Sequence, residues 1–466
     1  MEQENVKKIG LWIVALAFLL NPYFIGLIFS ADHQIENSIA ITLIIGFEVF
    51  LGFLGIGMYY KERIPANLRS NGMLLIITSL FCFAILEGAI FSFGEYDTDG
   101  QFSFGGRDLL PYALPVHAIE KHIAVFENLT NPYVAIPDPY LGWTTGNNTN
   151  ALQPLGYYQT NSIGVRSERE FNKTKEEGVL RIEMFGDSFV HSYDVPMNET
   201  LAFYLEQEAL TQTEVMNFGV GAYGIDQAYL RWKLLGKEYN PDIILIGFQA
   251  ENCKRNMNVV RKFYFRNTEI PFSKPRFILV NGSLVLVNYP TVYYKDVPNL
   301  VETFDRSPLS EYEYFYSKED YKTANPFLYF KTVRYLTTVI AEYQDKKNDK
   351  MNYEEGEIRD VCYAILEKFY NEASVNATVY ILHLPTQQDL ALKTEGEEFV
   401  YESLLKQLKK DFTVIDPTED LIEEAEKTGL ESLFVGHYSG QANEIVAKSI
   451  TKQIQAVPHE NISISE

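Results

Sequence analysis

The first 95 residues hold nearly all of the long apolar runs of the chain, and three of these runs reach bilayer-spanning length. They cover about residues 9–29, 38–60 and 73–93, and a membrane-spanning helix needs ~20 apolar residues. The first run is too long for a cleaved signal peptide and lacks a small-residue cleavage site. The pattern therefore predicts a three-helix transmembrane anchor over residues 1–94.

Flanking cations orient the predicted spans, because cytoplasmic loops carry an excess of Lys and Arg. Lys7 and Lys8 precede the first span, and Lys61, Arg63 and Arg69 lie between the second and third. The loop between the first two spans has neither Lys nor Arg. We therefore expect a multi-pass cell-membrane protein whose N-terminus is cytoplasmic and whose C-terminal part is extracytoplasmic.

The hydrophobic pattern changes after the anchor. Residues 95–178 are irregular and rich in Gly, Asn, Pro and aromatic side chains, which indicates a connector and lead-in. Over residues 179–457, apolar runs of strand length alternate with helical patterns. A β-rich stretch from about Phe263 to Val292, with Asn281-Gly282 as a hairpin signal, interrupts this alternation and is interpreted as an insertion at about residues 257–325. The predicted strands are Val179–Phe185, Glu214–Val220, Asp242–Phe248, Thr378–Leu384 and Phe412–Ile415.

Helical patterns separate these strands. They cover about Thr200–Leu210, Asp226–Lys237, Pro326–Tyr343, Glu355–Tyr370, Glu398–Lys409 and Gln441–Ile454. Buried strands that alternate with helices imply an α/β three-layer sandwich, with a mostly parallel sheet covered on both faces. In such sheets the functional site lies at the carboxyl ends of the strands.

Polar residues occur at these strand ends. Gly186-Asp187-Ser188 follows the first strand, and a serine in a strand-to-helix turn can present its hydroxyl in the open. The Gly-rich segment Asn217–Gly224 follows the second strand and can aim backbone N–H groups at a ligand. Glu251 and Asn252 come just after the third strand, where a side-chain amide would complete an oxyanion pocket. His437 lies just before the last helix.

The order and spacing of these four signals resemble the SGNH/GDSL hydrolase superfamily, whose four sequence blocks supply Ser, Gly, Asn and His. The resemblance covers about residues 139–455. It extends to Asp138–Trp143 and Thr160–Arg166, which look like segments that precede the serine block in membrane-linked members. It implies an SGNH/flavodoxin-like α/β domain and a serine-dependent hydrolase.

Taken residue by residue, the resemblance assigns three side chains. Ser188 matches the nucleophile, His437 the general base and Asn252 the oxyanion amide. The second-block glycine falls on Ala222, with Gly221 one residue before it, and the donor there is a backbone N–H. The resemblance implies no metal ion and no organic cofactor.

The acid of the family motif is missing. The family usually places Asp two or three residues before the catalytic His, where it orients the imidazole. Val435 and Phe434 stand at those positions here. Three interpretations remain open: a Ser–His dyad, a carboxylate from elsewhere such as Asp416, or a weakened or inactive enzyme.

The leading hypothesis is a membrane-anchored serine esterase that removes O-acyl groups from an extracytoplasmic glycan or cell-surface polymer. The second is an O-acyltransferase, in which a sugar hydroxyl replaces water in the second step. The third, suggested by the missing aspartate, is a catalytically silent glycan-binding protein with the same fold. The sequence does not indicate an oligomeric state.

Charge and sequons narrow the choice of partners. The formal net charge is −22, and only five of the 40 Lys and Arg and seven of the 62 Asp and Glu precede residue 95. A domain this acidic repels nucleic acid, so a nucleic-acid partner is not expected. Glycosylation sequons occur only after residue 95 and fit an extracytoplasmic surface. They lie at Asn128, Asn147, Asn172, Asn198, Asn281, Asn376 and Asn461.

A few other residues receive separate interpretations. Cys253 and Cys362 lie outside the predicted spans and can pair, but no disulfide framework or metal-ligand spacing is legible. Glu48 and Glu87 lie inside predicted spans, where an ionisable residue suggests function or, alternatively, a protonated or paired carboxyl. For two remaining histidines, a surface or structural role is expected at His191 and a core role at His383.

Overall fold

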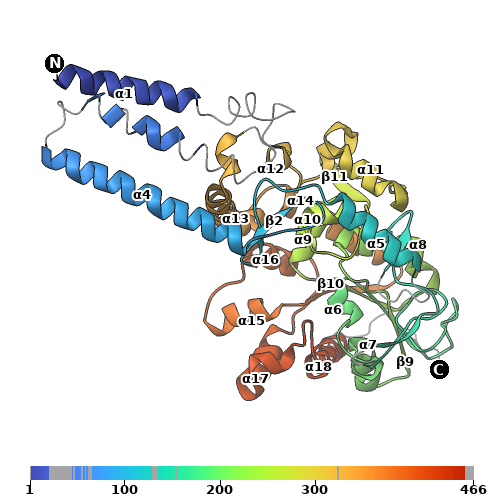
Figure 1. Ribbon diagram of the computed structural model, residues 1–466. Helices are drawn as coiled ribbons and strands as arrows, with labels where there is room; N and C mark the ends of the chain where they lie inside the picture. The colour runs from blue at the N-terminus through green and yellow to red at the C-terminus, as the bar shows by residue number, and fades with distance from the viewer. Residues whose placement is uncertain are drawn as a thin grey trace. The chain divides into compact units, whose positions relative to one another are not determined.

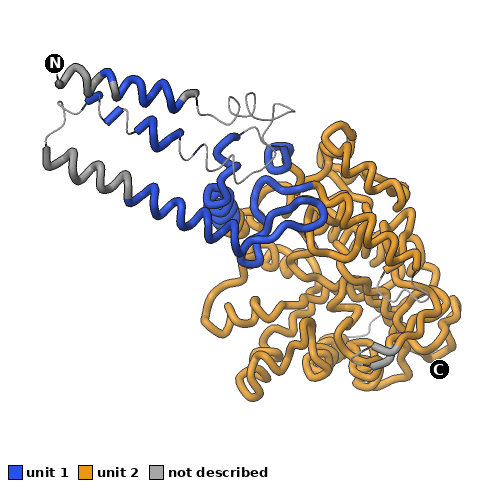
Figure 2. Tube along the Cα trace, in the orientation of Figure 1, with its two compact units in different colours: residues 1–113, 318–344 blue, residues 114–317, 345–466 orange. Residues whose placement is uncertain are grey.

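The fold is described from a computed structural model (Figure 1). The structure describes residues 2–19, 45, 48–53, 56–57, 59–60, 66–128, 135–153, 156–322 and 325–456. Two compact units are present (Figure 2): the first contains residues 1–113 and 318–344, and the second contains residues 114–317 and 345–466. The sequence placed its boundaries at residues 94 and 178, so the predicted lead-in from residue 114 onward belongs to the second unit.

The first unit contains helices and a small antiparallel sheet. Its elements are α1 (Glu2–Leu19), α4 (Ala66–Phe93), β1 (Glu95–Tyr96), β2 (Phe102–Phe104), β3 (Arg107–Asp108), α12 (Lys318–Tyr321) and the start of α13 (Lys331–Glu354). Within the described ranges, no helix combines the length and the hydropathy needed to cross a membrane. Residues 20–44 and other parts of the predicted spans lie outside the described residues. The three-span anchor therefore stays a prediction.

Glu87 has a structural explanation within this unit. Its carboxylate oxygens accept hydrogen bonds from the backbone N–H groups of Lys331 at 2.6 Å and Thr332 at 2.7 Å. These two residues begin α13, and the first N–H groups of a helix have no partner within the helix. A carboxylate at this end also complements the helix dipole. The contact supports the paired interpretation of Glu87.

A five-stranded parallel sheet organises the second unit. Its order is β14-β13-β10-β8-β9, and every neighbouring pair is parallel. The strands are β8 (Leu180–Phe185), β9 (Thr213–Asn217), β10 (Ile243–Phe248), β13 (Thr378–His383) and β14 (Val414–Ile415). All six residues of β10 are buried, as expected for a central strand covered on both faces. The predicted α/β fold with a parallel sheet is confirmed.

Helices cover both faces of this sheet (Figure 1). One hydrophobic core lies under α8 (Ile225–Leu234), α9 (Glu251–Arg255), α14 (Glu357–Ala373) and α16 (Glu402–Asp411). The other core lies under α7 (Leu201–Glu208), α15 (Gln387–Thr394), α17 (Thr418–Thr428) and α18 (Gly440–Ala456). On α14 the buried residues recur at helical spacing, which gives one apolar stripe facing the sheet.

The lead-in and the predicted insertion form smaller elements. They comprise α5 (Val116–Asn128), β4 (Ile136–Asp138), β5 (Gly142–Thr144), β6 (Asn150–Gln153), β7 (Gly156–Gln159), α10 (Arg261–Tyr264), β11 (Arg276–Val280), β12 (Ser283–Val287) and α11 (Val297–Glu302). Strands β11 and β12 pair antiparallel across Asn281 and Gly282, which both have positive φ. The predicted Asn-Gly hairpin is therefore present.

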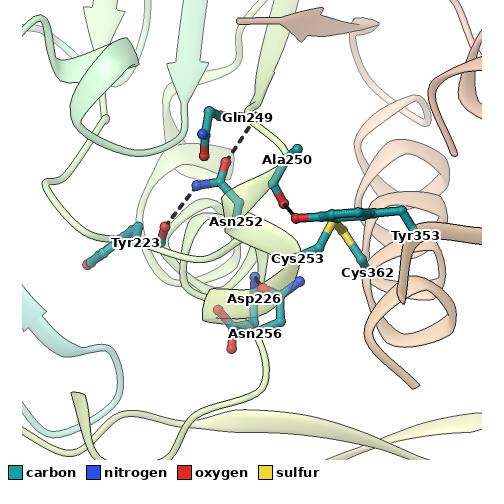
Figure 3. The surroundings of a disulfide bond; sticks show 9 residues. All are labelled: Tyr223, Asp226, Gln249, Ala250, Asn252, Cys253, Asn256, Tyr353 and Cys362. Atoms are coloured by element: carbon teal, nitrogen blue, oxygen red, sulfur yellow. Dashed lines mark hydrogen bonds between the residues drawn. A yellow bond between two sulfur atoms is a disulfide. The ribbon is translucent and has the colours of Figure 1, made fainter. Parts of the chain in front are cut away.

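A disulfide joins the two cysteines outside the predicted anchor. Cys253 on α9 bonds to Cys362 on α14, across a sequence separation of 109 residues (Figure 3). Both cysteines are fully buried. The bond fixes α9, which follows β10 directly, onto the long helix α14.

Candidate active site

Ser188 lies at a sharp turn between β8 and the short helix α6 (Ser188–His191). Asp187 caps this helix, and its carboxylate accepts the Phe189 N–H at 2.9 Å. A Cβ atom at Gly186 would lie 2.5 Å from Val190 Cγ2, so the turn has room only for glycine. The turn places the Ser188 hydroxyl at the carboxyl edge of the sheet, as predicted.

His437 reaches this hydroxyl from the other end of the sequence. Its Nε2 lies 2.7 Å from Ser188 Oγ. The residue belongs to a tight loop between the 3-10 helix Leu430–Leu433 and α18, in which the Val435 N–H donates to the His437 carbonyl at 2.9 Å. The next residue, Tyr438, is buried, and its hydroxyl donates to the Pro385 carbonyl at 2.8 Å. The structure therefore brings together the two residues that the sequence placed 249 positions apart.

Asp194 contacts the other side of the imidazole. Its Oδ2 lies 2.6 Å from His437 Nδ1 and accepts the His437 backbone N–H at 2.9 Å. Burial alone would raise the pKa of Asp194, but the hydrogen bonds and charge of His437 outweigh it and lower the pKa. When Nδ1 donates its proton to this carboxylate, Nε2 is left to accept the Ser188 proton. The Ser188 hydroxyl, the His437 imidazole and the Asp194 carboxylate are therefore linked by consecutive hydrogen bonds. This arrangement can activate a serine for acyl transfer.

The sequence interpretation did not find Asp194. The carboxylate does not precede the histidine; it lies six residues after Ser188, in the loop that follows α6. At the two positions where the family motif has its acid, Phe434 is buried and Val435 is 51% exposed. A Cβ atom at Gly436 would lie 2.4 Å from Asp194 Oδ2, so glycine makes room for the incoming carboxylate. Of the three open interpretations, the geometry matches a carboxylate from elsewhere.

Asp416, the carboxylate suggested from the sequence, is engaged elsewhere. Its Oδ1 lies 2.9 Å from His383 Nδ1, and its Oδ2 accepts from Lys409 Nζ at 2.6 Å. The other ring nitrogen of His383 lies 3.0 Å from the Tyr401 hydroxyl. Suggesting Asp416 as the partner of His437 was therefore wrong. His383 is a buried histidine with partners on both nitrogens, as predicted.

Arg166, at the end of the lead-in segment, holds the loop that carries Asp194. Its guanidinium donates to the carbonyls of His191 at 2.7 Å and Val195 at 2.6 Å, and also to that of Ser192. Ser192 adopts a left-handed backbone with φ of 56°. Burial lowers the pKa of Arg166 to about 10, which still leaves the side chain charged at neutral pH. These three bonds fix both sides of Asp194.

His191 has a structural role, one of the two expected. It is buried, and its Nδ1 lies 2.8 Å from the Gly219 carbonyl oxygen. Burial, followed by the nearby positive charge of Arg166, lowers the pKa of His191 well below its usual value. The imidazole is therefore neutral at physiological pH and ties the Ser188 turn to the loop after β9.

Asn252 is placed differently from the expectation. Its Nδ2 donates to Asp187 Oδ2 at 2.8 Å and to the Tyr223 carbonyl at 3.2 Å, and its Oδ1 accepts the Gln249 N–H at 3.1 Å. Arg255 also donates to Asp187 Oδ2 at 3.0 Å. Both amide hydrogens of Asn252 are therefore already bonded within the protein.

Gly221 and Ala222 lie in the loop after β9. The Gly221 carbonyl accepts the indole N–H of Trp143 at 3.0 Å. Ala222 has φ of 65°, a left-handed conformation that costs a residue with a Cβ about 1–2 kcal/mol. In the described part of the chain, the backbone N–H groups of Ser188, Gly221 and Ala222 meet no acceptor. These donors are therefore available to a bound group.

The described residues contain no group of three or more His, Cys, Asp or Glu side chains that could hold a metal ion.

Comparisons with known proteins gave structural matches alone. No protein-family model matches the sequence, and the search of curated proteins found no match. A lipolytic protein of the G-D-S-L family from Veillonella parvula matches with 12% identity and a TM-score of 0.32, covering 60% of this chain and 100% of that one. A lipase/acylhydrolase from Enterococcus faecalis matches with 14% identity and a TM-score of 0.29, covering 59% and 95%. A catalytic mutant of an acetylxylan esterase from Geobacillus stearothermophilus matches with 14% identity and a TM-score of 0.29, covering 61% and 96%.

Proposed function

We propose that this chain is a serine esterase that cleaves an O-acyl ester through an acyl-enzyme on Ser188. The observation that carries the proposal is the series in which Ser188 Oγ lies 2.7 Å from His437 Nε2 and His437 Nδ1 lies 2.6 Å from Asp194 Oδ2. A surface serine needs no such alignment, whereas a nucleophilic serine needs a base that is itself oriented by a third group.

The first half-reaction forms the acyl-enzyme. Ser188 Oγ attacks the ester carbonyl while His437 Nε2 takes the hydroxyl proton, and the carbonyl electron pair moves onto oxygen. Asp194 stabilises the imidazolium that results. The tetrahedral intermediate then collapses, the bond to the leaving alcohol breaks, and His437 returns its proton to that alcohol.

The second half-reaction releases the acid. Water enters in place of the alcohol, His437 removes one of its protons, and the hydroxide oxygen attacks the acyl carbon. Collapse of this second intermediate breaks the bond to Ser188 Oγ, which regains the proton from His437. In both steps the oxyanion accepts hydrogen bonds from backbone N–H groups. The backbone N–H groups of Ser188 and of the Gly221–Ala222 segment are available for this, because they have no acceptor among the described residues.

The substrate class and compartment form the finer part of the proposal. We place the reaction outside the cytoplasm, on an O-acylated glycan or cell-surface polymer, with the N-terminal part of the chain as a membrane anchor. The Cys253–Cys362 disulfide supports an oxidising compartment, because such bonds rarely persist in the cytosol. Two features of the sequence also support an extracytoplasmic location of the C-terminal part: the sequons after residue 95 and the distribution of cations around the apolar runs.

The proposal is tested with the detergent-solubilised full chain on an aryl acetate and an acetylated polysaccharide. We expect saturable release of acetate by the wild type, and a rate in Ser188→Ala and His437→Ala that equals the uncatalysed background. Circular dichroism confirms that the variants remain folded. Equal rates in the wild type and both variants would refute the proposed esterase activity. Acetyl transfer to added oligosaccharide, without free acetate, would identify a transferase instead.

A further inference from the structure

Arg255, the last residue of α9, reaches the serine turn. Its Nη1 donates to Asp187 Oδ2 at 3.0 Å and to the Tyr223 carbonyl at 3.4 Å. Asp187 directly precedes Ser188. Tyr223 directly follows the Gly221–Ala222 segment. One guanidinium nitrogen therefore joins the two segments whose backbone N–H groups are available to a bound group.

Asn252 bonds to the same two acceptors. Its Nδ2 lies 2.8 Å from Asp187 Oδ2 and 3.2 Å from the Tyr223 carbonyl oxygen (Figure 3). The two side chains differ in charge, because the amide is neutral and the guanidinium is a cation. In the described part of the chain, Arg255 is the cation that pairs with Asp187, whose side chain is 2% exposed. A carboxylate buried to this extent is costly unless a charge compensates it.

Arg255 is itself buried and charged. Its side chain is 11% exposed. Burial by itself would lower the pKa of Arg255, but the carboxylates of Glu251 and Asp187 outweigh burial and raise the pKa. Glu251 Oε1 lies 3.1 Å from Arg255 Nη2, and the Glu251 side chain is 43% exposed. Water can therefore solvate Glu251, whereas the buried Asp187 depends on the arginine.

The charge of Asp187 matters because the proposed reaction forms a second anion close to it. The oxyanion accepts from the backbone N–H of Ser188, and Asp187 is the residue that precedes this N–H. At about 6–10 Å and an effective dielectric constant of about 20, one uncompensated charge changes a rate by about 10–10²-fold. An unpaired Asp187 would therefore oppose the negative charge that catalysis has to stabilise.

We propose that Arg255 is a positioning residue that neutralises Asp187 and holds the two segments of oxyanion donors together. The assignment rests on the proposed esterase function. Asn252, expected from the sequence to donate to the oxyanion, shares the geometric part of this role through its bonds to Asp187 and Tyr223. The oxyanion then receives its hydrogen bonds from the backbone, and Arg255 removes the opposing charge beside it.

The test separates the charge of Arg255 from its hydrogen bonds, in the detergent-solubilised full chain. Arg255→Lys keeps a positive charge, whereas Arg255→Gln keeps an N–H donor and loses the charge. We expect the kcat of Arg255→Gln on an aryl acetate to fall about 10–10²-fold, with KM changed less than about threefold, because the charge acts on the transition state. Arg255→Lys should keep at least about a fifth of the wild-type kcat, because its ammonium still neutralises the carboxylate.

Arg261→Gln is the matched control. Arg261 is also buried, and its guanidinium lies over the rings of Tyr264 and Phe265. Its Nε and Nη1 have no hydrogen-bond partner, so it does not tie Asp187 to the protein through them. The kcat of Arg261→Gln should therefore stay close to that of the wild type. A loss as large as that of Arg255→Gln would mean that any buried arginine of this segment is needed, and would overturn the specific assignment.

A binding measurement separates this proposal from the proposed function. A boronic acid forms an anionic tetrahedral adduct with a nucleophilic serine. Arg255→Gln should weaken its binding by a factor similar to the loss in kcat, and Arg255→Lys should not. Wild-type kcat and boronate affinity in folded Arg255→Gln would overturn the proposal. A folded Arg255→Lys that loses as much kcat as Arg255→Gln would overturn it too, because charge would then not be the deciding property.

Arg255→Lys decides alone if Arg255→Gln does not fold. An active Arg255→Lys then supports the proposal, and a folded Arg255→Lys with a loss of about 10²-fold overturns it. A wild type no more active than Ser188→Ala would instead refute the esterase itself.

Discussion

Replacing Asp194 by Asn should separate the geometry of the site from its charge. In the structure one oxygen, Oδ2, faces two donors, the Nδ1–H and the backbone N–H of His437. An amide oxygen can take the same place, but it brings no negative charge to stabilise the imidazolium. If the amide nitrogen takes the place instead, Nδ1 must accept and Nε2 carries the proton. In that tautomer the imidazole cannot remove the proton of Ser188.

The size of the effect follows from these two outcomes. The corresponding change in serine proteases lowers kcat by about 10⁴, which equals about 5.4 kcal/mol at 1.36 kcal/mol for each factor of ten. We expect the kcat of Asp194→Asn on an aryl acetate to be about 10³–10⁴-fold lower than that of the wild type, with little change in KM. Asp416→Asn serves as the control, because Asp416 contacts His383 and not His437. Asp194→Asn with more than a tenth of wild-type kcat, or a larger loss in Asp416→Asn, would refute the assignment.

The same carboxylate makes a prediction about pH and stability. Partners in the folded state hold the pKa of Asp194 below its usual value of 3.8. A carboxyl with a lowered folded pKa contributes stability above its unfolded pKa and loses it as the pH falls through the folded one. The difference in Tm between wild type and Asp194→Asn should therefore be largest above pH 4 and shrink in more acidic buffer. A difference that grows with acidity would contradict this contact.

Three further substitutions test other features. Lysine in Arg166→Lys cannot donate to three carbonyls at once. The Asp194 loop should therefore shift, and kcat should fall by up to about 10²-fold while the chain stays folded; unchanged activity would mean that the loop needs no such support. Ala222→Gly should raise the free energy of unfolding by up to about 1 kcal/mol in a denaturant titration, because glycine adopts positive φ without strain; a loss would argue against that backbone. Glu183 is buried with both oxygens unpaired, and burial raises its pKa well above 4.5. Its stabilising contribution is therefore full below pH 4.5 and is lost as the pH rises through the folded pKa, so Glu183→Met should raise Tm more at pH 8 than at pH 4; equal gains would contradict this.

The sheet could be predicted from the sequence because each strand leaves a local signal. An apolar run such as Ile243–Phe248, between a helix pattern and polar residues, identifies a buried strand without knowledge of its neighbours. Ser188 and His437 follow from the same logic, because each adjoins an element boundary that the pattern defines. The parallel topology places Ser188 at the edge where the carboxyl ends of the strands gather, and the loop before α18 brings His437 to that edge.

Asp194 could not be found in this way, because it belongs to a loop with no periodic signal. Its partner is 243 residues distant, and the contact exists because Arg166 holds the loop and Gly436 leaves space for the carboxylate. The one usable hint was an acidic residue close after Ser188, in a chain that lacks the acid before His437. The pairing of Cys253 with Cys362 depends likewise on helix packing.

Asn252 could be placed at the end of β10 from the sequence, but its hydrogen bonds could not. Its side chain donates to Asp187 and to the Tyr223 carbonyl. These are tertiary contacts that leave no local signal in the sequence.

Covalent labelling shows whether Ser188 is the nucleophile. The full chain is incubated with a fluorophosphonate, digested, and the peptide that contains Ser188 is examined by mass spectrometry. We expect one phosphonylated residue, Ser188, with labelling that is lost in Ser188→Ala and slowed by orders of magnitude in Asp194→Asn. A Ser188 peptide that stays unmodified in folded protein, or equal labelling of Ser188→Ala, would contradict it.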